Sequence, residues 1–418
     1  MRRNAYKMAD GKLTRLTQNE LGAVITKHEA FLAGRQGGMR ANLSYHDLSG
    51  LSFFGRNLSD SNLTGACLFE ANLRNAKFDR ATLFCADLRS VDLCDASLLR
   101  ADLRGASLRG ANLTGANMEG VDLREGALAT ASDTGDLKAA HEKLTVADKG
   151  GANLSGANLS NARLSGAVAV DTNFSDATIK SAKISNAVLK GANFSGANLE
   201  NADFSKCDLR NVNLRNSILT GTAINLSEIP KEDQEGALTS TPQGLSAKDL
   251  PKPIEQLMKL HEIWADSKGL SGQQLDISKY DLRGCANFQR ARLTMMKGVG
   301  AILYGVNFCE SQLQAADFSI ADLRHANFES ADMRGGKFSG AQFTNCSLQK
   351  AQLQPLSIAS GKFIATNLAQ ASLRFANLSG ANLQQVNFRD ADLSDANLTD
   401  TDTTGADFTG ANMTGVRR

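Results

Sequence analysis

The chain has few aromatic residues and no long apolar run. Phe, Trp and Tyr make up 6% of its 418 residues, with a single Trp, and no stretch of 18 apolar residues occurs. The first shortage argues for a narrow core, and the second excludes a helix that spans a membrane. Residues 1–12 are basic and polar and lack the apolar centre of a signal peptide, so we expect a disordered tail there.

The chain also lacks a large excess of charge of either sign, because 46 Lys and Arg balance 44 Asp and Glu. No two of the seven cysteines have C-x-x-C spacing, which argues against a zinc site, and nucleotide-binding and hydrolase motifs are absent. We therefore expect no metal, no cofactor and no enzymatic activity. The odd cysteine count without a secretory leader predicts reduced thiols and a cytoplasmic protein, with secretion by a leaderless route as the alternative.

What the chain does contain is a period of five. In residues 100–120, "RADLRGASLRGANLTGANMEG", an apolar residue recurs at every fifth position and an alanine precedes each by two. On an α-helix such residues would spiral around the surface, and on a straight strand they would alternate between faces. The apolar residues face one common axis only if the chain turns a corner every five residues. This predicts a solenoid with an apolar axis.

The period extends over most of the chain in three registers. Central apolar residues run from Leu43 to Leu128, from Leu154 to Ile224 and from Phe288 to Met413, and the weak members are Ala169, Gly298 and Thr403. The string A-(D/N)-L-x-x resembles the pentapeptide repeat family. This resemblance implies an all-β solenoid, a right-handed quadrilateral β-helix with four repeats per coil. Residues 20 apart should then stack, and the rings of Phe288, Phe308 and Phe328 should form a column.

The chain also contains two copies of one larger module. With one gap, residues 21–50 align with residues 254–284, and His28-Glu29 falls on His261-Glu262. The pattern of each copy predicts an amphipathic helix that leads into the repeats. A solenoid needs such a cap because its first coil would otherwise expose apolar side chains and unpaired strand edges. Four of the five prolines lie between the copies, which is typical of a linker. The expected boundaries are capping helices at 13–36 and 253–268, β-helices at 41–225 and 275–418, and a linker at 226–252.

Two irregularities interrupt the period. An insert at about 129–150 either loops out of one continuous first β-helix or splits it, and we favour the loop because no proline-rich linker accompanies it. Ser132 or Asp133 would start a short helix there. Leu282 and Phe288 are six residues apart, which predicts a bulge, and bulky Met296 stands at an alanine position, from which we expect it to turn outward.

The candidate functional residues lie on the predicted surface. Arginines at a spacing of 20 should stack on successive coils of the first β-helix and could bind an acidic partner. The Asp and Asn residues before the central positions exchange freely, so we interpret them as hydrogen-bonding groups of the corners, and the capping histidines as packing residues. The predicted basic patch consists of Arg80, Arg89, Arg100, Arg104, Arg109 and Arg124.

The second candidate surface is the last coil, whose central residues are Phe408 and Met413. No amphipathic helix follows them, so an apolar cross-section with free strand edges would remain uncovered. We expect a homodimer through this coil, with two-fold symmetry. The alternative is that the last ten residues fold back over the coil and that Arg417 and Arg418 cover its edge.

Three functions remain open. The first is a non-enzymatic scaffold that presents two rigid β-helical rods to an unidentified protein partner. The second follows from the resemblance: some pentapeptide repeat proteins mimic DNA and interact with the topoisomerase gyrase, which requires an acidic rod. Residues 1–225 carry 27 Lys and Arg against 23 Asp and Glu, so mimicry of a nucleic acid is disfavoured, and we expect no nucleic-acid partner. The third is a secreted bacterial effector.

Overall fold

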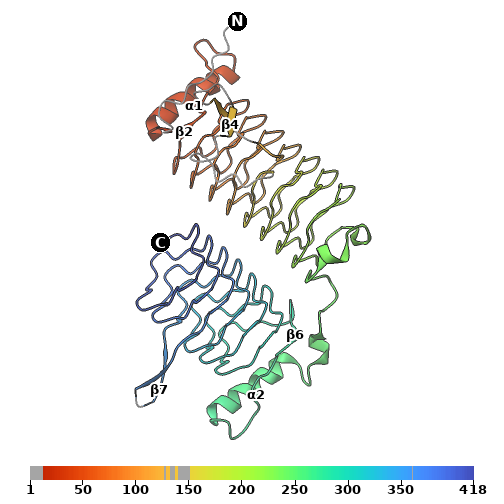
Figure 1. Ribbon diagram of the computed structural model, residues 1–418, viewed down its shortest axis with the longest axis vertical. Coiled ribbons are helices and arrows are strands. Elements are labelled where there is room, and N and C mark those ends of the chain that lie inside the picture. The colour runs from red at the N-terminus through yellow and green to blue at the C-terminus, as the bar shows by residue number, and fades with distance from the viewer. Residues whose placement is uncertain (1–12, 127–128, 132–136, 140–150, 360) are drawn as a thin grey trace. The chain divides into compact units, whose positions relative to one another are not determined.

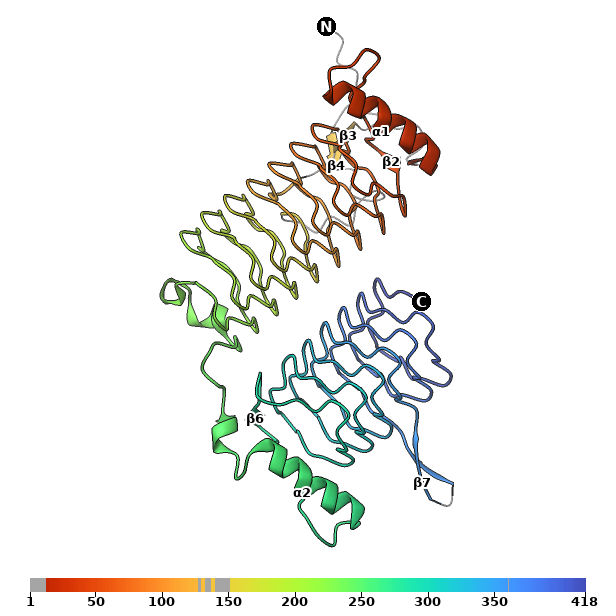
Figure 2. The same ribbon diagram turned by 180° about the vertical axis from the view of Figure 1, so that it is seen from behind.

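The protein forms two compact units, Met1–Ser240 and Thr241–Arg418 (Figure 1). The computed structural model describes residues 13–126, 129–131, 137–139, 151–359 and 361–418. In each unit one α-helix comes first along the chain, and the chain then winds into stacked coils (Figure 2).

Each coil has four sides, and each side is one five-residue repeat. Residues 20 apart form parallel bridges, as between Asp102 and Asp122. The N–H of Leu103 donates to Asp122 O at 2.8 Å, and the N–H of Ala106 donates to Leu103 O at 3.0 Å around the corner. The backbone is thus paired between coils and within corners, and the predicted four repeats per coil are confirmed.

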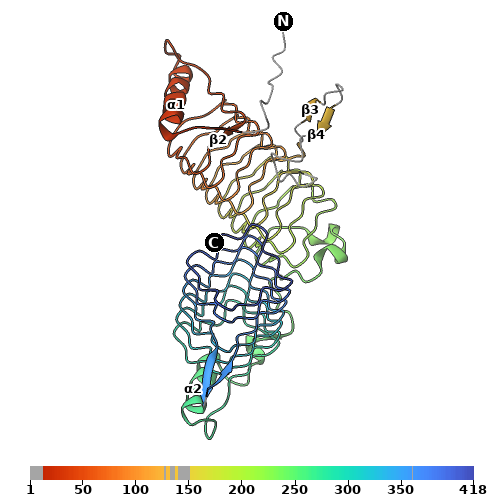
Figure 3. The same cartoon turned by 60° about the vertical axis from the view of Figure 1, so that its left-hand side comes forward.

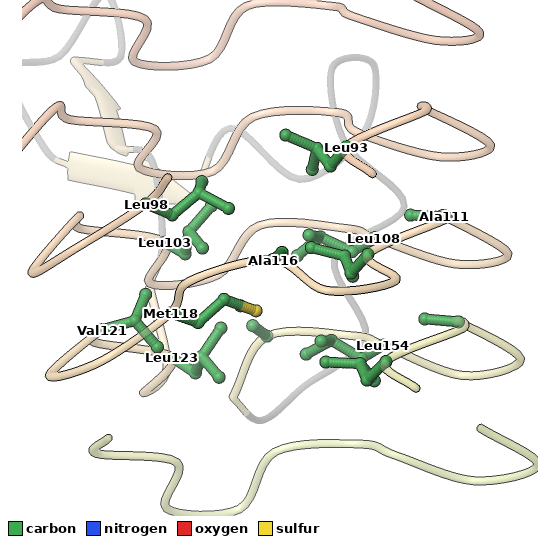
Figure 4. Close-up of a cluster of buried hydrophobic side chains, with 14 of the residues drawn as sticks. Leu93, Leu98, Leu103, Leu108, Ala111, Ala116, Met118, Val121, Leu123 and Leu154 are labelled. Atoms are coloured by element: carbon green, nitrogen blue, oxygen red, sulfur yellow. The ribbon is translucent and has the colours of Figure 1, made fainter. Parts of the chain in front are cut away.

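The core is the axis of each coil. Central leucines such as Leu103 and Leu108 and alanines such as Ala111 and Ala116, each two before a central residue, point inward and are buried (Figure 4). In the second unit the rings of Phe288 and Phe308 stack at 5.1 Å and those of Phe308 and Phe328 at 4.8 Å, so the predicted column is confirmed.

Both units begin with the same arrangement. In the first, β1 (Thr14–Arg15) pairs in parallel with β2 (His46–Asp47), and α1 (Gln18–Leu32) lies between them in sequence. In the second, β5 (Leu245–Ser246) pairs with β6 (Tyr280–Asp281) around α2 (Ile254–Asp266). The helices contribute Leu21 and Ile25, or Ile254 and Leu257, to the cores. Each module therefore includes a strand upstream of its helix, which the sequence alignment did not reach.

The insert loops out of one continuous first β-helix, as predicted. Ser107 bridges Asn153, and the N–H of Ala152 donates to Leu123 O at 2.7 Å, so the coil resumes across the insert. The insert therefore starts soon after Leu123, earlier than the expected residue 129. Its described parts are the antiparallel strands β3 (Ala129–Ala131) and β4 (Leu137–Ala139), visible in Figure 3.

Three predictions on this insert meet different outcomes. Residues 137–139 form a strand rather than part of the expected helix. The predicted starts of that helix, Ser132 and Asp133, lie outside the described residues. Leu128, expected to be the central residue of a repeat, also lies outside them.

The expected linker at 226–252 is folded in the structure. Its first part closes the last coil of the first unit through the 3₁₀ helices η1 (Leu226–Glu228) and η2 (Lys231–Gln234), with Ile229 only 4% exposed. Its second part contains β5 and η3 (Ala247–Asp249). Two prolines of this region precede helices, Pro230 in the expected linker before η2 and Pro253 just after it before α2, where a fixed φ and a missing N–H cost little.

A second insert was not predicted. Lys337 bridges Asn367 across 30 residues, because β7 (Leu356–Ala359) and β8 (Lys362–Ile364) leave the coil as a hairpin. Ile358 and Phe363, expected in the core, are 52% and 65% exposed, so that expectation was wrong.

The predicted bulge near Leu282 is confirmed, and the predicted exposure of Met296 was wrong. A three-residue turn at 283–285 absorbs the extra residue, so that Asp281 bridges Ile302, 21 positions on. Met296 is fully buried. A Cβ on Gly298 would lie 2.7 Å from the ring of Phe318, so the missing side chain at this central position makes room for a large neighbour.

Candidate interaction surfaces

The six arginines of the predicted basic patch lie in three columns of the first β-helix. The bridges 20 residues apart place Arg104 beside Arg124 on one side of the coil and Arg89 beside Arg109 on the next. Arg80 and Arg100 lie at a corner, where both have positive φ (55° each). The stacking predicted from the spacing is confirmed.

Four of the six arginines are paired with carboxylates, so much of the positive charge of this surface is compensated. Ion pairs of 2.7–2.8 Å join Arg89 to Asp87, Arg104 to Asp102 and Arg124 to Asp122, each within one repeat. Arg80 pairs with Asp60 of the preceding coil at 2.7 Å. Positive and negative side chains therefore lie side by side on this surface. Their fields partly cancel, which weakens the long-range attraction of an acidic partner.

The ion pairs shift the titration of their members. Burial alone would raise the pKa of Asp122, but the hydrogen bonds from Arg124 outweigh it and lower the pKa. The hydrogen bond to Asp102 raises the pKa of Arg104. Both groups therefore stay charged at neutral pH.

Two of these arginines also cover aromatic rings. The guanidinium of Arg89 lies 5.5 Å from the ring centroid of Phe69, and that of Arg104 lies 5.2 Å from the centroid of Phe84. We call these four residues the Arg–Phe ladder. Sequence reasoning missed it, although each Phe precedes its Arg by 20 positions, the spacing that stacks neighbours.

The Asp and Asn residues before the central positions act as corner acceptors, as interpreted from the sequence. Asp102 Oδ1 accepts the N–H of Arg104 at 3.2 Å, and Asn153 Oδ1 accepts the N–H of Ser155 at 3.0 Å. Either residue type supplies that oxygen, which explains why the two exchange.

The last coil of the second unit borders a hollow of about 430 Å³. Phe408 and Met413 are half-buried there, and Phe408 stacks on Phe388 at 5.0 Å. Arg417 continues the coil by bridging Asn397, contrary to the alternative in which it folds back over the edge. The residues that line the hollow are Leu398, Asp400, Thr401, Thr403, Ala406, Phe408, Met413 and Arg418.

Two of the cysteines occupy alanine positions of the repeats. All seven cysteines are free thiols. Cys346 is buried at an alanine position, where burial raises the pKa of its thiol, and Cys207 is half-buried at another, with its pKa raised for the same reason. Within the described ranges, no group of three or more His, Cys, Asp and Glu could hold a metal ion, and no helix is long and apolar enough to cross a membrane.

Comparison with known structures gives matches to repeat proteins of this kind. QnrB1, a plasmid-mediated fluoroquinolone resistance protein, is 16% identical over 48% of this chain and 90% of its own, with a TM-score of 0.34. HetL, involved in heterocyst differentiation regulation in the cyanobacterium Nostoc, is 19% identical over 93% of both chains, with a TM-score of 0.20. Rfr23 from the cyanobacterium Cyanothece is 33% identical over 32% of this chain and 86% of its own, with a TM-score of 0.13. No curated protein matches the sequence.

The family model described as pentapeptide repeats matches more than half of the sequence. The matched ranges are 57–84, 86–124, 152–191, 182–221, 286–329, 301–340, 321–354, 362–395 and 391–417. They lie in both units and coincide with the four-sided coils. The chain belongs to the pentapeptide repeat family, and each unit carries the right-handed quadrilateral β-helix predicted from the sequence.

Proposed function

We propose that the protein is a non-enzymatic cytoplasmic scaffold that binds a protein partner along the side of its first unit. The observation that carries this proposal is the Arg–Phe ladder, in which two guanidiniums are stacked on rings and also held by carboxylates. Arg and aromatic side chains are enriched in protein interfaces and among the residues that dominate binding energy. Side chains that are already held in place lose little entropy on binding.

The charge pattern of the ladder favours a protein over a nucleic acid. Asp87 and Asp102 accompany its two arginines, so a matching partner would carry charges of both signs at a repeat of about 4.8 Å, the spacing of paired strands. A phosphate backbone would meet these carboxylates unfavourably. Mimicry of DNA would require the opposite, an acidic surface, which the near-neutral charge of the chain does not favour.

Affinity capture from cells of the source organism tests this proposal. We expect the Arg89→Gln, Arg104→Gln double variant to lose at least tenfold of a captured protein that the unmodified chain retains. Arg210→Gln is the matched control, because Arg210 forms the same kind of pair with Asp208 in the same unit, at 2.6 Å. Equal capture by both variants, or turnover of a small molecule by the pure protein, would overturn the proposal.

We also propose that the last coil of the second unit associates with a second copy of itself. The apolar side chains of Phe408 and Met413, which border the hollow, support this proposal. A self-complementary contact about a two-fold axis would cover both edges. In light scattering, we expect a dimer mass for the unmodified protein and half of it for the Phe408→Glu, Met413→Glu variant. A monomer mass for the unmodified protein at micromolar concentration would contradict the dimer.

A further inference from the structure

The two capping helices are attached through equivalent buried histidines. His28 of α1 is fully buried, its Nε2–H donates to Ser59 O at 3.0 Å, and its Nδ1 accepts the N–H of Ala41 at 3.0 Å. The ring therefore joins the helix to the segment that enters the coil and to the coil itself. Its stacking on Phe31, at 6.0 Å between ring centroids, covers one face.

The second unit repeats this connection. His261 of α2 is fully buried, and its Nδ1 accepts the N–H of Leu275 at 3.0 Å. Its Nε2 faces the backbone of Leu293 and Thr294 outside normal hydrogen-bond geometry. Trp264, the single Trp of the chain, stacks on the ring at 5.4 Å and 18°.

The hydrogen-bond partners of both rings favour the neutral imidazole. Each Nδ1 receives a backbone N–H, so a proton on that nitrogen would place two donors face to face and leave the amide without an acceptor. We propose that His28 and His261 are pH-sensitive latches, which release the capping helices from the first coils when the imidazoles are protonated.

The electrostatic surroundings agree with this proposal. Burial lowers the pKa of His28, Arg40 lowers it further, and Ser59 O together with the carboxylates of Asp60 and Glu29 oppose part of that shift. Glu29 is itself held by Arg56 at 2.8 Å.

Burial likewise lowers the pKa of His261, and the backbone of Thr294 and Leu293 opposes part of that shift. The charged residues near this ring, Glu262, Asp266 and Arg292, interact with one another, and Arg292 pairs with Asp266 at 2.6 Å. The carboxylates of Asp60 and Glu29 oppose the lowering for His28, so we expect the pH effect on α1 to level off at a higher pH than the effect on α2.

The sign of the pH effect follows from the lowered values. The detached helix binds a proton near the ordinary imidazole pKa of about 6.5, whereas the attached helix binds it only at lower pH. Attachment is therefore fully stable above pH 6.5, weakens up to about tenfold for each pH unit below it, and levels off below the pKa of the attached state. Detachment would uncover Leu43 and Leu48, which are buried in the first coils.

Hydrogen exchange of the full chain between pH 7.5 and 4.5, corrected for the intrinsic pH dependence of exchange, tests the latches. We expect the protection factors of residues 18–32 and of 254–266 to fall up to tenfold per pH unit below about pH 6.5, and those of 18–32 to level off at the higher pH. The fluorescence of Trp264 should change together with the second region. Helices that keep constant protection across this range would overturn the proposal.

Three variants separate titration from general acid damage. His28→Gln and His261→Gln keep an acceptor that cannot titrate, so each should abolish the pH dependence of its own helix only. His46→Gln is the control, because His46 lies near the same cap but bonds to Ser44 O of its own loop. If a variant does not fold, NMR titration of the unmodified protein decides, since a His28 that titrates while α1 stays protected contradicts the latch.

Discussion

In the first unit residues 225–240 cover the last coil, whereas in the second unit the last coil borders an open hollow. Ile229 enters the core of the first unit, and Gln234 Nε2 donates to the carbonyls of Leu226 and Ile229 at 3.0 and 2.6 Å. In the second unit Phe408 is half-buried, stacks on Phe388 and borders the hollow. The repeats themselves therefore do not cover the end of a β-helix. A segment outside the repeats must do so, separately for each end.

The cores of the two units also differ. The first is mainly Leu and Ala, with one stacked pair, Phe174 and Phe194, at 4.9 Å. The second contains the three-ring column and the Phe318–Phe338 pair, at 6.0 Å. Larger rings in the same four-sided tube require smaller residues beside them, which is the role of Gly298 opposite Phe318.

The largest expected effect comes from breaking the three-ring column. Phe308→Ala should lower the free energy of unfolding of the second unit by about 3–5 kcal/mol, because it removes the central ring of a fully buried stack. Denaturant unfolding followed by hydrogen exchange would locate the loss. The matched change in the first unit is Leu103→Ala, and each variant should leave exchange in the other unit unchanged. A loss shared by both units would show that they do not unfold separately.

A smaller effect should follow from opening the closed end. Ile229→Ala should cost about 2–3 kcal/mol, since the side chain is buried but lies at the end of the core. Amides of residues 214–238 should exchange faster. The counterpart in the second unit, Phe408→Ala, should cost about 1 kcal/mol because that ring is half-exposed already. Equal losses at the two ends would contradict the difference between them.

Gly298→Ala sharpens the comparison of the cores. The added methyl would lie 2.7 Å from the Phe318 ring, and such overpacking should destabilise the second unit by about 1–3 kcal/mol in thermal unfolding. Gly22→Ala in α1 is the control, because no atom lies within 4 Å of the new methyl. It should stabilise its helix by about 0.5–1 kcal/mol. A neutral Gly298→Ala would mean that the ring of Phe318 moves freely.

The smallest effect concerns one half-buried carboxylate in each unit. The hydrogen bond from Arg210 is the main reason why the pKa of Asp208 is lowered to about 2. For Asp407, hydrogen bonds from Thr409 are the main reason why its pKa is lowered to about 2. Their contribution to stability is present above the unfolded value of about 4 and is lost as pH falls from about 4 to about 2. Carboxyl NMR titration measures both values, and Asp208→Asn should flatten this part of the stability profile of the first unit. An unperturbed titration of Asp208 would show that its pair with Arg210 does not persist in solution.

Much of the fold could be predicted from the sequence, because the period is local and the same contact recurs in every coil. A spacing of five defines the corner, the family resemblance implies four corners per coil, and residues 20 apart must then stack. The Phe288 column and the stacked arginines follow from that geometry, whereas the packing role of His28 follows from the helical spacing of the cap. The interpretation of the arginines as a basic patch failed in part, since the spacing does not reveal which partner each guanidinium chooses.

The sequence by itself determined the repeat, the duplicated module and the residues of the axis, while the four sides of the coil were implied by the resemblance to the pentapeptide repeat family. Ile358 and Phe363 are exceptions on the axis. These two preserve the period, because the hairpin of β7 and β8 adds ten residues, a whole number of repeats, and leaves the register intact. One local signal existed: Pro355 stands at a corner position where neighbours such as Lys350 have positive φ, a conformation closed to proline. Only the tertiary structure decided where the chain leaves the coil, which end is closed and which arginine lies on which ring, because these depend on contacts between segments that no short period relates.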